Sequence, residues 1–237
     1  MDQFARSEML IGAEGVRRLR EARVALFGVG GVGGFAAEAL IRSGVGALDL
    51  FDNDQVSPTN LNRQIIALHS TLGRDKTEVI RERLLDINPN AQITVHNLFY
   101  LPQEADRVDL SQYDFVADAI DTVAAKLDLA QRAYALGVPL ISAMGAGNRL
   151  DPGQLRVGDI FETHSCPLAR VMRRELRKRG VPALRVVYSL EDALTPAATE
   201  APPPGSSRRA VPGSMIFVPA AMGLMMAAEI VRSLTEK

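Results

Sequence analysis

The sequence has very little cysteine, with Cys166 alone among 237 residues. A single cysteine excludes an internal disulfide and cannot supply the paired cysteines of a structural zinc site. The three histidines, His69, His96 and His164, show no metal-ligand spacing. We therefore expect no zinc, and a chain that suits the reducing cytoplasm.

An excess of charge is also missing, since 27 basic and 28 acidic residues give a net charge of -1 at pH 7. The overall field favours neither nucleic acid nor an anionic membrane, so any basic surface must be local. Residues 1–10 carry charges and show no signal peptide. The most apolar stretch, residues 215–231, is too short for a membrane span and contains Pro219 and Glu229. We expect a buried helix there, at a subunit contact, and no membrane.

Short β-rich runs alternate with helical patterns along the first 142 residues. Strands are predicted at residues 23–27, 47–51, 92–96, 115–117 and 138–142, and helices at residues 35–41, 77–87 and 123–136. This alternation predicts an α/β fold with a mostly parallel sheet and helices on both faces. The length permits one or two domains, and we predict one.

The pattern loosens after residue 150, so we divide the single domain into a core, residues 1–150, and a C-terminal extension, residues 151–237. Two further strands, residues 155–161 and 185–189, are expected to extend the sheet in antiparallel fashion. Residues 192–213 are rich in proline, alanine, serine and glycine without apolar periodicity. That composition predicts a mobile loop, and the sequence does not distinguish a lid or partner-binding loop from plain disorder.

A glycine-rich loop joins the first predicted strand to the following helix. Gly28, Gly30, Gly31 and Gly33 form the pattern GxGGxG. Glycines let the backbone approach a phosphate, and the helix N-terminus adds free N–H groups and partial positive charge. Asp52 ends the second strand, where a carboxylate can accept hydrogen bonds from ribose hydroxyls. These features predict a nucleotide site without separating NAD from ATP.

The residues after the second strand separate the two nucleotides. Arg63 and Lys76 bring two positive charges near the glycine loop. Such charges suit a triphosphate under attack at its α-phosphorus better than they suit hydride transfer. Asp54 could hold magnesium. Asp118 and Asp121 follow a later strand, at the strand end where α/β sheets place ligands, although Asp118 could equally cap the next helix.

The motifs GxGGxG, DxDxVxxxNLxRQ, GxxK and DAxD, in this order, resemble the ThiF/MoeB/HesA family, which is related to ubiquitin-activating enzymes. The resemblance covers residues 4 to about 142. It implies a Rossmann-like fold, adenylation of a carboxylate with ATP and magnesium, and a homodimer. The residue roles that it implies are ribose binding for Asp52, a supporting role at the nucleotide for Asn60, phosphate binding for Arg63 and Lys76, and magnesium binding for Asp121. We also count Asp54 and Gln64, in the same segment, among the nucleotide-binding candidates.

The resemblance also implies a role for the N-terminus. In this family an N-terminal arginine reaches the triphosphate bound to the other subunit, and Arg6 occupies the matching place. Arg6 is therefore predicted to complete the site of a second copy of the chain.

The C-terminal half narrows the resemblance. Residues 142–152 and 167–177 resemble the tRNA threonylcarbamoyladenosine dehydratase branch, which extends the match to nearly the whole chain. The branch implies a substrate carboxylate on the threonine moiety of a modified adenosine in tRNA, whose adenylate cyclises and expels AMP. Cyclisation needs no enzyme cysteine, because the attacking carbamoyl group is already tethered beside the acyl-adenylate. The absence of cysteine from residues 192–213 argues against a sulfur-relay partner.

A basic helix would give tRNA a place to bind. Arg170, Arg173, Arg174 and Arg177 are spaced i, i+3, i+4 and i+7, and Lys178 follows. On a helix these arginines would share one face, where phosphates could bind. The alternative is an ordinary solvated helix face.

Three other functions compete with a tRNA-modifying enzyme. The first activates the C-terminal glycine of a ubiquitin-like or sulfur-carrier protein, and the missing zinc cysteines argue against it. The second is an NAD-dependent oxidoreductase, and the third is a non-catalytic tRNA-binding protein. The cationic and acidic residues after the glycine loop argue against these two, so we predict ATP-dependent adenylation.

Overall fold

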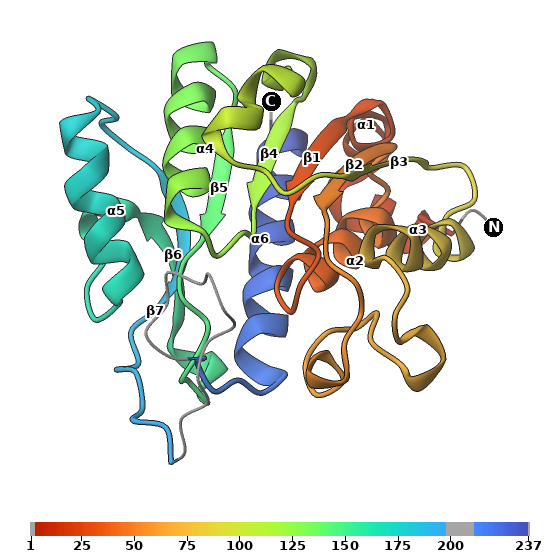
Figure 1. The fold of residues 1–237 in the computed structure, drawn as a ribbon. Coiled ribbons are helices and arrows are strands. Elements are labelled where there is room, and N and C mark those ends of the chain that lie inside the picture. Colours follow the sequence, from red (N-terminus) through yellow and green to blue (C-terminus); the bar gives the residue numbers. More distant parts are fainter. Residues whose placement is uncertain (1–2, 198–210, 237) are drawn as a thin grey trace.

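Seven strands form one sheet in the order β3-β2-β1-β4-β5-β7-β6 (Figure 1). The structure is a computed structural model that describes residues 3–197 and 211–236. Its strands are β1 (Arg23–Phe27), β2 (Ala47–Asp52), β3 (Gln92–Asn97), β4 (Phe115–Asp118), β5 (Leu140–Ala143), β6 (Leu155–Asp159) and β7 (Arg185–Ser189). Every pair is parallel except β6 with β7.

Six α-helices of the described residues flank the sheet. They are α1 (Ala5–Glu21), α2 (Gly33–Ser43), α3 (Lys76–Ile87), α4 (Val123–Leu136), α5 (Pro167–Lys178) and α6 (Phe217–Thr235). Side chains of α1, α2, α3 and α6 join one core cluster, and those of α4 and α5 join the other, so each face of the sheet has its own helical layer (Figure 1). This arrangement confirms the predicted α/β class.

The central strands are apolar on both sides because both faces are covered. In β1, Val24 and Leu26 pack into the cluster with α2, whereas Ala25 and Phe27 pack into the cluster with α4. Successive side chains of a strand point to opposite faces. A nearly continuous apolar run is therefore the signature of a doubly covered parallel sheet.

The extension adds two strands to the sheet that pair antiparallel with each other, as predicted. Relative to the other described strands only β6 is reversed, because β7 runs parallel to β5. The predicted strand at residues 155–161 ends at Asp159, because the Asp159 carboxylate accepts a hydrogen bond from the Phe161 backbone N at 2.8 Å. That bond caps a 3-10 turn, Ile160–Glu162, which turns the chain away from the sheet.

Helix α6 is the described helix that is long and apolar enough to span a membrane by length and composition, although it contains Glu229. Its Met222, Met226 and Ile230 are fully buried in the cluster that also holds α1 and α2. The apolar side of α6 therefore packs in the core, as predicted for a buried helix. Leu224 lies on the opposite side and is 51% exposed.

The predicted mobile loop at residues 192–213 falls mostly outside the described residues. The structure describes residues 192–197 and 211–213 of it. Short 3-10 helices occupy other connections: Pro58–Asn60, His69–Thr71, Pro102–Arg107, Leu110–Gln112 and Pro152–Gln154.

Candidate nucleotide-binding site

A cavity of about 520 Å³ lies at the carboxyl ends of the central strands. Its wall is formed by the glycine loop after β1, the segment after β2, the start of α3, the loops after β4 and β5, and the start of α6. Strand order reverses between β1 and β4, since the chain proceeds from β1 to β2 and β3 on one side and to β4 and β5 on the other. Open α/β sheets bind ligands at such a reversal.

The four glycines of the loop divide into two pairs. Gly28 has a φ of 90°, and a Cβ there would lie 2.8 Å from the Ala119 carbonyl oxygen. A Cβ on Gly33 would lie 1.8 Å from the Gly28 carbonyl oxygen. Both positions need glycine because the protein packs against itself there. Gly30 and Gly31 instead line the cavity, and a Cβ on Gly30 would come no closer than 3.8 Å to another side chain or backbone.

Asp52 fastens the glycine loop to the end of β2. Its Oδ2 accepts a hydrogen bond from the Val29 backbone N at 2.7 Å, and its Oδ1 accepts one from the Asp54 backbone N at 2.8 Å. Each carboxylate oxygen can accept a further bond. Asp52 lines the cavity and so can both hold the loop and receive ribose hydroxyls.

Lys76 opens α3 and is 5% exposed. Its Nζ donates to Asp54 Oδ2 at 2.7 Å, and both side chains line the cavity. The ammonium group is therefore held at the cavity by an exposed carboxylate, which an anionic ligand could replace. This ion pair gives Asp54 a partner inside the protein, and magnesium binding by Asp54 stays a prediction.

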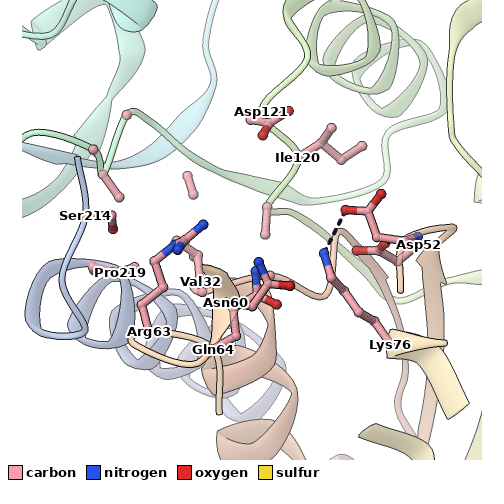
Figure 2. Close-up of a pocket in the computed structure, with 18 of the residues that line it drawn as sticks. Val32, Asp52, Asn60, Arg63, Gln64, Lys76, Ile120, Asp121, Ser214 and Pro219 are labelled. Atoms are coloured by element: carbon pink, nitrogen blue, oxygen red, sulfur yellow. Dashed lines mark hydrogen bonds and ion pairs between the residues drawn. The ribbon is translucent and has the colours of Figure 1, made fainter. Parts of the chain in front are cut away.

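Arg63 enters the cavity from the segment after the 3-10 helix Pro58–Asn60 (Figure 2). Its Nη1 donates to the Thr59 carbonyl oxygen at 2.6 Å and to Asn62 Oδ1 at 3.0 Å. Burial lowers the pKa of the guanidinium, which nevertheless remains protonated. Within the described part of the chain no carboxylate forms an ion pair with Arg63. Arg63 is thus a half-buried cation whose positive charge is uncompensated at the cavity.

Two amide side chains complete this wall. Asn60 Oδ1 accepts a hydrogen bond from the Ser57 backbone N at 3.1 Å. Gln64 Oε1 is buried and has no hydrogen-bond partner among the described residues. An unpaired buried polar atom costs about 1–3 kcal/mol. The Gln64 amide lines the cavity, so a polar ligand could supply the missing partner.

Asp121 lies across the cavity from Arg63 and Lys76, in the turn between β4 and α4 (Figure 2). Three or more His, Cys, Asp or Glu side chains do not gather as a metal site anywhere in residues 3–197 and 211–236. Magnesium does not require such a cluster, because it commonly binds one or two carboxylates together with water and substrate phosphates. A single carboxylate opposite two cations fits magnesium bound to a phosphate chain.

Asp118 has a different place from Asp121. It is fully buried, and its Oδ2 accepts hydrogen bonds from Lys126 Nζ at 2.9 Å and from Ser142 Oγ at 2.6 Å. It does not line the cavity, so the two aspartates are not a ligand pair. The sequence analysis missed Lys126, although the apolar Leu129 and Ala130, three and four residues later on the same face of the predicted helix, were a signal.

Further cavity residues carried no sequence motif. The aromatic and aliphatic side chains Phe51, Leu98 and Tyr100 lie in the wall near Asp52 and suit the flat face of a base. On the other side the wall is made by the loop after β5, Leu168 of α5, and Ser214.

The family of the chain follows from comparison with known proteins. The sequence matches the ThiF family over residues 4–237. The chain belongs to the ThiF family. It is 39% identical to the tRNA threonylcarbamoyladenosine dehydratase of Bacillus subtilis (strain 168) over 241 residues, which cover 99% of this chain and 95% of the relative. The predicted family is thereby confirmed.

Solved structures show the same fold. The crystal structures of the Escherichia coli tRNA N6-threonylcarbamoyladenosine dehydratase, TcdA, in complex with ATP and in complex with AMP each match with a TM-score of 0.89 and 32% identity. Each match covers 99% of this chain and 94% of the other. This relative of nearly equal length thus binds both ATP and AMP.

Two groups of predicted residues lie outside the cavity of this ThiF-family chain. Arg6 is exposed on α1 and does not line the cavity of its own chain. The basic residues of α5 also lie outside it, although Leu168 at the start of the same helix lines the wall.

The basic residues of α5 are not equivalent. Arg173 donates to the Thr163 carbonyl oxygen at 2.8 Å, and Arg177 lies over the ring of Phe161 at 5.1 Å. Arg173 therefore stabilises the preceding loop, which leaves the exposed arginines of the helix for an external anion.

Two more cations of α5 share one carboxylate. Glu175 Oε1 accepts hydrogen bonds from Lys178 Nζ at 3.0 Å and from Arg174 Nε at 2.9 Å. The bonds from Lys178 and Arg174 lower the pKa of Glu175 to about 2. Glu175 thus remains ionised at neutral pH and cancels part of the basic charge of the helix.

Proposed function

We propose that this ThiF-family protein is an ATP-dependent tRNA threonylcarbamoyladenosine dehydratase. The observation that carries the proposal is one cavity, lined by Arg63, Lys76 and Asp121, in a chain that aligns over 99% of its length with a relative of that name. Similarity of this extent to a protein of nearly equal length supports a shared reaction more strongly than the glycine loop does.

ATP is proposed to bind along the wall from Phe51 to the glycine loop. The base would lie against Phe51 and Leu98, and Asp52 would accept hydrogen bonds from the ribose. The phosphates would then follow the loop toward the N-terminus of α2, where the partial positive charge of the helix end attracts anions. Asn60 and Gln64 would contact the nucleotide from the side, and the unpaired Gln64 Oε1 would gain a donor there.

Arg63 and Lys76 would stabilise the negative charge that develops when the substrate carboxylate oxygen attacks the α-phosphorus and pyrophosphate leaves. For this Lys76 must exchange its Asp54 partner for a phosphate oxygen. Magnesium, bound by Asp121 and phosphate oxygens, would supply further charge neutralisation when present. In the second step a carbamoyl group of the same substrate attacks the acyl carbon and expels AMP, so the nucleoside loses one water overall.

The tRNA is proposed to contact α5. Arg170, Arg174, Arg177 and Lys178 are exposed on this helix, whose first turn supplies Leu168 to the cavity. The same helix therefore connects the reaction space with a basic surface for tRNA phosphates. The buried Cys166 lies at the N-cap of this helix and offers no accessible thiol, which fits a reaction without a sulfur-relay partner.

We further propose a cytoplasmic homodimer. Met9 and Leu10 of α1 are 83% and 88% exposed, and Leu10 lines a groove of about 610 Å³ between α1, α2 and α6. Exposed apolar side chains beside an apolar groove are typical of a protein interface. The family resemblance implies that Arg6 of a second copy would then reach the nucleotide site.

The reaction is tested directly with tRNA that carries threonylcarbamoyladenosine. Incubation with ATP and magnesium should lower the mass of the modified nucleoside by one water and release AMP and pyrophosphate in equal amounts. An unchanged nucleoside mass would refute the proposed reaction. Exchange of pyrophosphate into ATP that is stimulated by a ubiquitin-like protein, and not by tRNA, would favour the activator of a protein C-terminus instead.

A further inference from the structure

A buried ion pair lies beneath the cavity. Lys126 of α4 and Asp118 at the end of β4 both have fully buried side chains, with Nζ and Oδ2 2.9 Å apart. Ser142 of β5 closes the group, because its Oγ accepts from Lys126 Nζ at 3.0 Å and donates to the same Asp118 oxygen at 2.6 Å. Two charges lose their hydration here, and a buried pair of this kind is not by itself a source of stability. A geometric role is therefore the better explanation.

The remaining oxygen of Asp118 shows what the group holds. Asp118 Oδ1 accepts a hydrogen bond from the Ile120 backbone N at 3.1 Å. One carboxylate thus fixes the turn before Asp121 through Ile120 and fixes the helix after Asp121 through Lys126. Asp121 lies between these two attachments, only five residues before Lys126 in the sequence.

The same turn is fastened to the glycine loop. The Ala119 backbone N donates to the Phe27 carbonyl oxygen at 2.8 Å, and the Ala119 carbonyl oxygen packs against Gly28. Any shift of the turn would change the separation between Asp121 and the loop that faces the phosphates. The ion pair is in a position to set that separation.

We propose that Lys126 is a positioning residue that acts through Asp118 to hold Asp121 at the distance from the glycine loop that binds magnesium-complexed ATP. The inference rests on the proposed nucleotide site and adds a residue that touches neither nucleotide nor metal. Groups that orient a metal ligand from behind typically change metal affinity 10- to 100-fold when they are removed.

The test measures ATP affinity by calorimetry with and without magnesium, which needs no tRNA and no turnover. Wild-type protein should bind ATP more tightly when magnesium is present. In Lys126→Met, affinity without magnesium should stay within about twofold, while the gain from magnesium should fall about tenfold or more. If wild-type protein binds no ATP, the proposed nucleotide site itself fails. If it binds ATP without a magnesium-dependent gain, the magnesium role of Asp121, and with it the role of Lys126, is refuted. If wild type shows the gain and Lys126→Met keeps it, only the role of Lys126 is refuted.

A coupling measurement separates positioning from general stability. Asp121→Asn should lose the same magnesium-dependent gain. Adding Lys126→Met to Asp121→Asn should then reduce the gain little further, because both substitutions act on magnesium through the Asp121 carboxylate. Additive losses in the double variant would overturn the proposal. The variant Lys126→Arg should restore part of the gain, since a guanidinium can keep an ion pair with Asp118.

A double variant without either buried charge tests the proposal even if Lys126→Met alone does not fold. Lys126→Met combined with Asp118→Asn leaves no buried charge unpaired and keeps an acceptor for the Ile120 backbone N. This double variant should fold and still lose the magnesium-dependent gain, because α4 is no longer tied to the turn. A gain equal to wild type would overturn the proposal.

Asp49 provides a matched control elsewhere in the sheet. It is a buried carboxylate of β2 that accepts hydrogen bonds from Arg23, His96 and Tyr113, and it does not line the cavity. Asp49→Asn should lower Tm without changing the response to magnesium. An equal loss of the magnesium response in Asp49→Asn would show that any buried defect has this effect, and would refute a specific role for Lys126.

Discussion

The nucleotide cavity and the surface of α5 use positive charge in opposite ways. In the cavity, Lys76 is 5% exposed, and its ammonium group is held by one carboxylate at 2.7 Å. On α5, the side chains of Arg174 and Lys178 are 68% and 62% exposed and share Glu175. Charges in the cavity act at short range and at fixed positions, whereas those on α5 act mainly through their sum. Single substitutions should therefore have large effects in the cavity and small, salt-dependent effects on α5.

The largest effect is expected at the glycine loop, where two neighbouring positions should respond differently. Gly33→Ala places a Cβ 1.8 Å from a backbone oxygen, so the loop cannot keep its conformation. We expect a loss of at least about 4 kcal/mol in the free energy of unfolding, which is exceptional for one substitution. Urea denaturation measures it.

The paired variant Gly30→Ala has a Cβ with 3.8 Å of clearance and should fold normally. Because its methyl group enters the cavity, ATP should bind about tenfold more weakly, equal to about 1.4 kcal/mol. Calorimetry gives the affinity. Gly30→Ala with wild-type affinity would show that the phosphates do not approach this part of the loop.

The next largest effect is expected at Lys76. Lys76→Ala removes a cation from the cavity and leaves only the exposed Asp54 without its partner, so Tm should change little. The loss of transition-state charge stabilisation should reduce kcat/KM for ATP about 100- to 1,000-fold. Rates of AMP release measure this loss.

Arg74 is the matched control for Lys76. It lies two residues earlier, forms an ion pair with the exposed Glu82 and does not line the cavity. Arg74→Ala should retain wild-type kcat/KM. Equal losses in the two variants would mean that general electrostatics, and not position, governs the cavity.

The fold could be predicted because its signals are local. Apolar runs that alternate with helical patterns located five parallel strands and their connecting helices, since each element is buried against the next along the chain. The extension was harder to predict. Asp159 ends β6 with a side-chain hydrogen bond to Phe161, and the direction of β7 depends on where α5 returns the chain.

The sequence predicts the site well only where all residues of one type in a motif have the same role. The sequence treats Gly28 and Gly30 alike, although Gly28 is required by the close approach of Ala119 and Gly30 faces the cavity. It likewise groups Asp118 with Asp121, because burial against Lys126 depends on the packing of α4 on the sheet. Tertiary contacts decide such cases, and a pattern along the chain does not contain them.

Substitution of the exposed arginines of α5 should have a moderate effect on tRNA binding. Arg170→Ala combined with Arg174→Ala should weaken tRNA binding and reduce the slope of log affinity against log salt by about two, about one for each phosphate contact. ATP affinity should not change. Filter binding of tRNA across a potassium chloride series measures the slope.

Arg173 is the control within the same helix. Arg173→Ala removes the hydrogen bond to the Thr163 carbonyl oxygen, so we expect a lower Tm and an unchanged salt slope. If Arg173→Ala altered the slope as much as the exposed pair did, the division of α5 into structural and free arginines would be wrong.

The smallest effect is expected at Glu175, where removing a negative charge should strengthen tRNA binding. Glu175→Gln frees Arg174 and Lys178 from their shared carboxylate, so affinity should rise a few-fold and the salt slope should steepen by up to about one. Since the Lys178 and Arg174 bonds lower the pKa of Glu175 to about 2, the carboxylate stays ionised and the increase should be equal at pH 5 and pH 8.

The same pKa fixes how Glu175 contributes to stability. The folded-state pKa of about 2 lies below the value of about 4.3 for an unfolded chain, so the ion pairs stabilise the fold above about pH 4. That contribution is lost as the pH falls toward 2. The Tm difference between wild type and Glu175→Gln should therefore be small, constant from pH 5 to 8, and narrower at pH 2. A Tm difference that changed between pH 5 and 8 would mean that Arg174 and Lys178 do not hold Glu175 ionised, and that their charge is as available as that of Arg170.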